Sequence, residues 1–155
     1  MDNNMQNDYY QNNGTYQTPP TQKKLLEADR NWALTALLGI ATCGIYYIVV
    51  FTMMGCEINQ TASPRDGKKT MNYCLATLLL GPLTCGIFPL IWFHNFSDRV
   101  GREARLRGVD TNFGAASFWL WYVLGSFIIV GPFVYLYKLC VAMNGINESY
   151  NRCGR

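Results

Sequence analysis

Histidine and paired cysteines are scarce in this sequence. It has one histidine, His94, and none of its six cysteines lies in a C-x-x-C pair. Because zinc is bound by cysteine and histidine at short, regular spacings, a zinc site has no credible ligand set here. The sequence also has no Ser/His/Asp set, Cys/His pair, phosphate-binding glycine loop or paired carboxylates within an apolar run. We therefore expect a protein that is not an enzyme, without catalytic residues, bound metal or cofactor.

Formal charge is absent from three long stretches, which are residues 32–54, 73–93 and 117–137. Twenty-one residues of α-helix span roughly 31 Å, about the thickness of the hydrocarbon core of a bilayer. A helix of this length in a soluble protein normally has a polar face, and these stretches show none. The mean hydropathy of +0.01 hides this segregation. The sequence thus predicts an integral membrane protein.

An excess of positive charge is also missing, because the formal net charge is only +3. No basic stripe is interleaved with stacking aromatics, so nothing indicates a nucleic acid partner. Positive charge beside apolar segments is instead typical of attraction to anionic lipid headgroups. Membrane lipids, chiefly anionic ones, are therefore the expected partners.

The chain divides into a tail and a membrane domain. Residues 1–22 are rich in Asn, Gln and Tyr and have almost no aliphatic side chains to bury, which predicts a disordered tail. Residues 23–155 contain the three apolar segments and form the predicted membrane domain. Asp29 or Asn31 is expected to cap a helix that starts at Trp32.

The three apolar segments resemble one another. They contain GIATCGIY at 39–46, GPLTCGIFP at 81–89 and GSFIIVGPF at 125–133. Each has a glycine, a second glycine five or six residues later, and then an aromatic residue. Segments one and three also close with the matching triplets EIN at 57–59 and GIN at 145–147. Such self-similarity predicts one structural unit that is used three times.

Glycine and proline occupy the middle of each segment, where a plain spanning helix would prefer leucine or isoleucine. Proline removes a helix hydrogen bond, and glycine adopts backbone angles that end a helix. A threonine one turn earlier could bond the freed carbonyls. The predicted helix-break and packing residues are Gly39, Thr42, Gly44, Gly81, Pro82, Thr84, Gly86, Pro89, Gly125, Gly131 and Pro132.

Two arrangements remain open, and both are all-α. The four segments outside the apolar stretches contain three, three, four and three Lys and Arg residues, so alternate segments show no charge bias. Three kinked spans should place more positive charge on the cytoplasmic side. Equal counts are expected if every flank faces the cytoplasm and each unit is a re-entrant helix-break-helix hairpin.

An amphipathic, arginine-rich helix is predicted at about residues 94–107, with Gly108 as its stop signal. We expect it to lie at the headgroups with its arginines against lipid phosphate. The lysine that directly follows the third segment can reach the same level along its four-carbon stem. The predicted headgroup contacts are Arg99, Arg102, Arg105, Arg107 and Lys138.

With these motifs, the chain resembles the domain-of-unknown-function 4234 family of small, mostly bacterial membrane proteins. The resemblance rests on an aromatic near the segment start, then Thr-x-Gly-Ile-aromatic, then an apolar run that ends near Ile-Asn. It is complete at residues 32–59 and partial at 73–93, whereas the third unit has Gly131-Pro132-Phe133 in place of Thr-x-Gly-Ile. It implies a multi-pass protein of the bacterial cytoplasmic membrane with unassigned activity, and no functional residues carry over.

Our leading hypothesis is a non-enzymatic membrane scaffold, which forms a homo-oligomer or binds a membrane protein through its glycine-bearing segments. Close approach at small residues favours helix association in membranes. The alternatives are a small transporter or channel subunit, whose broken helices would line a cavity, and an accessory subunit of a membrane enzyme.

Overall fold

The computed structural model describes residues 25–153, and all regular structure in this range is helical. The all-α prediction is therefore confirmed. The predicted tail at residues 1–22 lies outside the described residues.

Three long helices are each preceded by a shorter helical arm. Within each pair, the arm and the long helix are separated by a turn of two or three residues. The first pair is α1 (Trp32–Ala41) and α2 (Ile45–Asp66). In the second pair the arm is α3 (Tyr73–Leu78) with α4 (Leu80–Leu83), and the long helix is α5 (Ile87–Leu106). In the third, the arm is α6 (Ala115–Ser117), the π-helical η1 (Phe118–Val123) and the 3₁₀-helical η2 (Leu124–Ile128), and the long helix is α7 (Gly131–Cys153).

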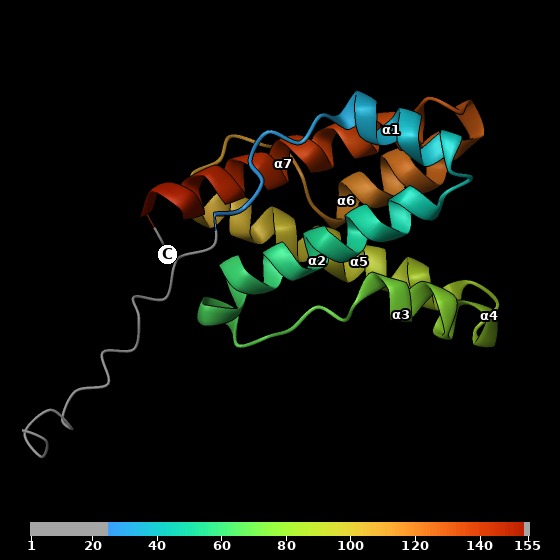
Figure 1. Cartoon of the computed structure of the whole chain (residues 1–155), viewed down its shortest axis with the longest axis horizontal. Coiled ribbons are helices and arrows are strands. Elements are labelled where there is room, and N and C mark those ends of the chain that lie inside the picture. The colour runs from blue at the N-terminus through green and yellow to red at the C-terminus, as the bar shows by residue number, and fades with distance from the viewer. Residues whose placement is uncertain (1–24, 154–155) are drawn as a thin grey trace, which may run out of the picture.

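The long helices α2, α5 and α7 pack against one another. Each arm packs on its own long helix and on that of another pair, so α1 lies on α7, α3 on α2, and η1 on α5. The three turns lie together at one end of the molecule, on the right of Figure 1. The far ends of the long helices lie on the left (Figure 1).

Aromatic side chains fill the space between the helices. Phe93 of α5 is 2% exposed and sits at the centre of this core. Its ring contacts those of Phe51, Tyr73, Trp92, Phe118, Tyr122 and Tyr135. Since these rings come from all three pairs, the aromatic core joins the pairs into one unit.

Asparagine side chains begin two of the arms. Asn31 accepts hydrogen bonds from the N–H groups of Ala33 and Leu34 and so caps α1, as one of the two caps expected there. Asn72 caps α3 in the same way through the Cys74 N–H.

None of the helices within residues 25–153 combines the length and the apolar character that crossing a bilayer requires.

The three apolar stretches do not form continuous helices. The backbone leaves the helix at residues 42–44, 84–86 and 129–130, inside each stretch. The arginine-rich helix expected at 94–107 is likewise not a separate element, because it is the second half of α5, which runs unbroken from Ile87.

Candidate functional site: an apolar end opposite a charged end

The turn between α1 and α2 is closed by Thr42, Cys43 and Gly44. Cys43 and Gly44 both have positive φ, at 50° and 92°. The Gly44 N–H donates to the Gly39 carbonyl at 2.8 Å, and the Cys43 N–H donates to Ile40 at 3.1 Å. These are the paired bonds of a Schellman motif, which satisfies the last carbonyls of a helix. The spacing of Gly39 and Gly44 is therefore the spacing of this motif.

The Thr42 hydroxyl links the two helices across the turn. It donates to the Leu38 carbonyl at 2.8 Å and accepts from the Tyr46 N–H at 3.0 Å. It thus satisfies one carbonyl at the end of α1 and one N–H at the start of α2. Such satisfaction is required of any chain break that lies away from water.

The second turn repeats this geometry at Thr84, Cys85 and Gly86. Cys85 and Gly86 have φ of 50° and 83°, and the Gly86 N–H donates to the Gly81 carbonyl at 2.8 Å. The Thr84 hydroxyl donates to Leu80 at 2.6 Å and accepts from the Phe88 N–H at 3.0 Å. One sequence pattern therefore builds the same turn twice.

The third break is built differently. Ile129 has a positive φ of 59°, and no threonine bridges the two helices. The backbones of Gly125 and Gly131 approach so closely that a Cβ on Gly131 would lie 2.3 Å from the Gly125 Cα. Only glycine fits at this crossing.

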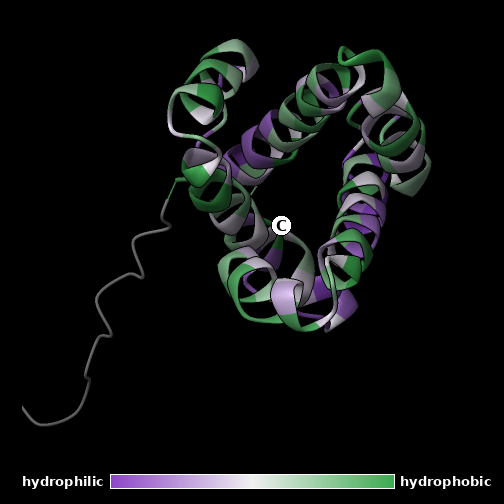
Figure 2. Cartoon of the chain, turned by 90° about the vertical axis from the view of Figure 1, so that its right-hand side faces the viewer, coloured by the Kyte–Doolittle hydropathy of each residue, from purple (hydrophilic) through white to green (hydrophobic). Residues whose placement is uncertain are grey.

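Large apolar side chains are exposed around these turns. Leu83 is 78% exposed, and Phe127 and Ile129 are 87% and 77% exposed. Others at the same end are Leu37, Ile40, Ile45, Leu79, Ile87, Leu124, Ile128 and Val130. Figure 2 looks onto this end, where hydrophobic colours predominate. Large exposed apolar patches are typical of interfaces with a protein or a membrane.

Buried ion pairs lie toward the opposite end. Arg30, which precedes α1, bonds the Glu57 carboxylate with both terminal nitrogens at 3.3 and 2.8 Å. Glu57 also accepts from the Asn147 amide at 2.9 Å. Burial alone would lower the pKa of Arg30, but its bonds to Glu57 and Glu27 outweigh burial and raise it. The ion pair thereby joins the segment before α1 to α2, and the Asn147 amide links it to α7 of the third pair.

A second buried arginine, Arg99 of α5, organises the loop at residues 67–72. Its nitrogens contact both Asp66 oxygens at 2.9 and 3.1 Å and the Lys68 carbonyl at 2.6 Å. Further partners are the side chains of Asn59, Ser63 and Thr70. Burial would raise the pKa of Asp66, but the hydrogen bonds from Arg99 and the Lys68 N–H outweigh it and lower that pKa. The loop that leads into α3 is thus fixed to α5.

The third cluster surrounds Glu103, whose side chain is 3% exposed. It accepts from Arg107 at 2.6 Å and from Arg65 at 3.1 Å. Arg107 also donates to the Thr61 carbonyl at 3.0 Å. The polar end is therefore held together by the chain's own opposite charges.

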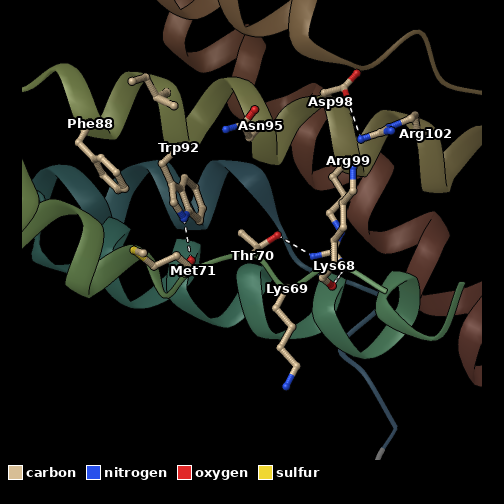
Figure 3. A pocket seen from close by; sticks show the side chains of 11 residues that line it. Lys68, Lys69, Thr70, Met71, Phe88, Trp92, Asn95, Asp98, Arg99 and Arg102 are labelled. Carbon is tan, nitrogen blue, oxygen red and sulfur yellow. Dashed lines mark hydrogen bonds and ion pairs between the residues drawn. The ribbon is translucent and has the colours of Figure 1, made fainter. Parts of the chain in front are cut away.

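Two surface cavities lie beside the buried arginines and the turns. A groove of about 370 Å³ lies between α5 and the loop at residues 67–72 (Figure 3). A second cavity, of about 510 Å³, lies among the three pairs at the apolar end. Its walls carry the rings of Tyr47, Phe51, Tyr73, Tyr122 and Tyr135.

The predicted break residues lie at or beside the breaks. Pro89 is the third residue of α5 and Pro132 the second of α7, where a missing N–H leaves no helix bond unmade. Pro82 lies in α4. A Cβ on Gly39 would lie 2.2 Å from the Tyr47 ring, whereas one on Gly81 would find ordinary contacts at 3.6 Å. The close approaches at Gly39, Gly125 and Gly131 are therefore made within this chain.

The predicted headgroup residues divide into two groups. Arg102 and Arg105 are exposed, and Arg102 pairs with the half-exposed Asp98 at 2.9 Å. Lys138 is partly exposed on α7. Arg99 and Arg107, by contrast, have side chains only 6% and 1% exposed and bond the chain's own carboxylates. The structure therefore directs these two arginines inward.

Asparagines of α7 were not recognised in the sequence as functional positions. The Asn144 side chain bonds the backbone N–H and carbonyl of Arg30. The Asn151 side chain bonds the backbone N–H and carbonyl of Leu26 in the same way. Asn147 donates to the Glu27 carbonyl between them. Their spacing of three and four residues puts them on one helix face, which is the signal that could have identified them. They fix residues 25–31, which lead into α1.

Comparison with known proteins gives one family match. The model of a family described as a domain of unknown function (DUF4234) matches residues 30–102. This range includes the first two turns and ends before the third apolar stretch. No curated protein and no solved structure matches the chain.

Proposed function

We propose that the chain is a non-enzymatic membrane protein. The premise is that residues 30–102 belong to the domain of unknown function 4234 family. The chain's three helix-turn-helix pairs would be one repeated re-entrant unit that enters the bilayer from a single side. The observation that carries this proposal is the gathering of all three turns, with their exposed apolar side chains, at one end of the bundle.

The length of the apolar part of α2 and of α5 supports insertion into one leaflet. From Ile45 to Cys56 in α2 and from Ile87 to Ser97 in α5 no charged residue occurs. These runs extend roughly 15–17 Å, which is about half the thickness of a hydrocarbon core. The buried ion pairs of the other end would then lie at or outside the headgroups, where charge is tolerated.

The first two turns are suited to this depth because their backbone groups are bonded internally. The hydroxyls of Thr42 and Thr84 and the Schellman bonds supply the partners that water would otherwise provide. A non-polar turn of this kind requires no cavity or pore around it.

A scaffold or oligomerising role fits this geometry best. Helices that stop within the hydrocarbon region of a bilayer require other protein to cover their tips. The glycine contacts at Gly39 and Gly131 are used inside the chain. A second copy or a membrane protein partner would therefore meet the exposed apolar side chains, such as Phe127 and Ile128. We place the protein in a bacterial cytoplasmic membrane with its charged end toward the cytoplasm.

Cysteine labelling tests the one-sided topology. In a cysteine-free background, Lys68→Cys, Arg105→Cys and the native Cys153 each report on one charged flank, and all three positions are exposed. A membrane-impermeant maleimide is applied to intact bacterial cells and to inverted membrane vesicles. Re-entrant units predict that all three cysteines react from the same side. Reaction of the Arg105→Cys variant from the side opposite to the other two would establish spanning segments instead.

Cross-linking and flux measurements separate a scaffold from a transporter. A scaffold predicts a discrete cross-linked oligomer in membranes, which Phe127→Ser and Ile128→Ser together disrupt, whereas Leu106→Ser at the charged end does not. Ion or solute flux in proteoliposomes that is lost on Lys138→Ala would contradict the scaffold and favour a transport protein.

A further inference from the structure

We propose that the groove along α5 binds one anionic phospholipid lengthwise, with its phosphate at the charged end and an acyl chain toward the turns. The inference rests on the proposed membrane insertion and names the lipid class that this surface selects. It stands on the order of the side chains along the groove and on their net charge.

The groove follows one face of a single helix. Phe88, Ile91, Trp92, Asn95 and Arg102 recur at spacings of three, four and seven residues, so they form a continuous stripe on α5. The loop at residues 67–72 forms the opposite wall (Figure 3). Between Phe88 and Arg102 the helix rises roughly 21 Å, comparable to a headgroup with the upper part of its chain.

Polarity changes once along this stripe. Phe88 and Ile91 lie toward the second turn, and Ile91 is 50% exposed. Asn95 lies in the middle, and Asp98, Arg99 and Arg102 lie toward the charged end (Figure 3). The apolar-to-charged direction of the groove is therefore the same as that of the whole bundle. A phospholipid in the surrounding leaflet has its apolar and charged parts in this same order.

The charged end of the groove has positive charge in excess. Lys68, Lys69, Arg99 and Arg102 line it together with a single acidic residue, Asp98. Arg99 is already bonded to Asp66 and four other groups, so it positions the loop and is not the ligand. Lys69 extends away from α5 in Figure 3.

Two cations then remain for a phosphate. Arg102 is half exposed and, among residues 25–153, pairs only with the similarly exposed Asp98, and Lys68 is exposed on the facing loop. An arginine and a lysine on opposite walls are a suitable pair for a headgroup phosphate, because both attract anions and arginine can bind two of its oxygens.

Native mass spectrometry of the full chain in neutral detergent tests the site. The protein is offered equal amounts of phosphatidylglycerol and phosphatidylcholine with identical acyl chains. We expect the wild type to retain one phosphatidylglycerol in preference to phosphatidylcholine. Lys68→Gln with Arg102→Gln should reduce this preference about 10- to 30-fold, since each basic residue contributes about 1 kcal/mol to anionic lipid binding.

A matched control removes equal charge elsewhere. Arg65→Gln with Arg152→Gln changes two exposed arginines that do not line the groove and should leave the preference unchanged. Ile91→Asn should weaken phosphatidylglycerol binding through the apolar end. Equal retention of the two lipids by the wild type, or equal losses in the charge variant and its control, would overturn the proposal.

Two further measurements distinguish a lipid phosphate from a soluble phosphate, and failure of the lipid site from failure of the membrane proposal. Glycerol 3-phosphate at the same concentration should not displace the lipid, and complete displacement would mean a site for a soluble phosphate. Flotation with vesicles of pure phosphatidylcholine reports insertion alone. The Lys68→Gln/Arg102→Gln variant should still float, whereas loss of flotation by the wild type would refute the membrane proposal itself.

Discussion

Replacing Arg99 with lysine tests whether one buried guanidinium holds the charged end together. The arginine makes six contacts between 2.6 and 3.1 Å to groups of α2 and the loop at residues 67–72. Lysine retains the positive charge but has only three donors on a single atom, so it replaces at most half of these contacts.

The expected loss in the free energy of unfolding follows from the number of contacts that lysine cannot replace. Hydrogen bonds to charged groups contribute about 1.5–3 kcal/mol each, and unpaired buried acceptors add to the loss. Since neighbouring contacts are not additive, we expect Arg99→Lys to reduce the free energy of unfolding by about 3 kcal/mol. For a chain of this size, that corresponds to a Tm lower by roughly 6–12 °C.

The assay is thermal unfolding of the purified chain in detergent, followed by intrinsic fluorescence. Arg102→Lys is the matched control, because Arg102 lies on the same helix with its side chain 52% exposed and paired with the exposed Asp98. Exposed pairs at this spacing contribute about 0.3–0.5 kcal/mol, so the control should shift Tm by less than about 2 °C. Equal shifts in the two variants would refute the role assigned to Arg99.

Three further predictions concern a turn, a helix contact and pH. Thr42→Val should lower the free energy of unfolding by about 1–2 kcal/mol through the lost hydroxyl bonds, and Thr42→Ser should restore most of it in the same thermal assay. Gly101→Ala should destabilise by about 1–3 kcal/mol, because the new Cβ would lie 2.3 Å from a backbone oxygen, whereas Gly55→Ala meets only an ordinary contact at 3.6 Å; equal Tm values would contradict this. Because Arg99 lowers the pKa of Asp66, this carboxylate stabilises the fold above its unfolded pKa of about 4, and the stabilisation is lost as pH falls through the lower folded pKa. Asp66→Asn should flatten the Tm-against-pH profile below about pH 5, and an unchanged profile would exclude this effect.

Local patterns in the sequence predicted much of the backbone. The all-α class and the family of residues 30–102 are confirmed. The breaks coincide with the glycine and proline clusters because a Schellman turn is specified by adjacent residues, here Thr42 to Gly44 and Thr84 to Gly86. The third unit, whose sequence departs from the pattern, also has a different turn at Ile129.

The arginine clusters could not be predicted in this way. Arg99 and Asp66 are 33 residues apart, and neither lies in a sequence pattern that indicates its partner. The arginines after Phe93 therefore resembled a separate surface helix. Nothing between Pro89 and Gly101 stops a helix, so α5 continues and turns Arg99 toward α2. The asparagines of α7 were missed because their partners are backbone groups of a distant segment.

The depth of the turns in a bilayer tests the central claim most directly. Spin labels are attached in turn to the native Cys43, Cys85 and Cys153, each kept as the single cysteine of its variant. All three cysteines are exposed in the structure. Their relative accessibility to oxygen and to a water-soluble nickel chelate is measured in phosphatidylcholine and phosphatidylglycerol vesicles. One-sided insertion predicts that Cys43 and Cys85 lie about 10–15 Å below the phosphates, with Cys153 in water. Equal access of the nickel chelate to all three labels would contradict it.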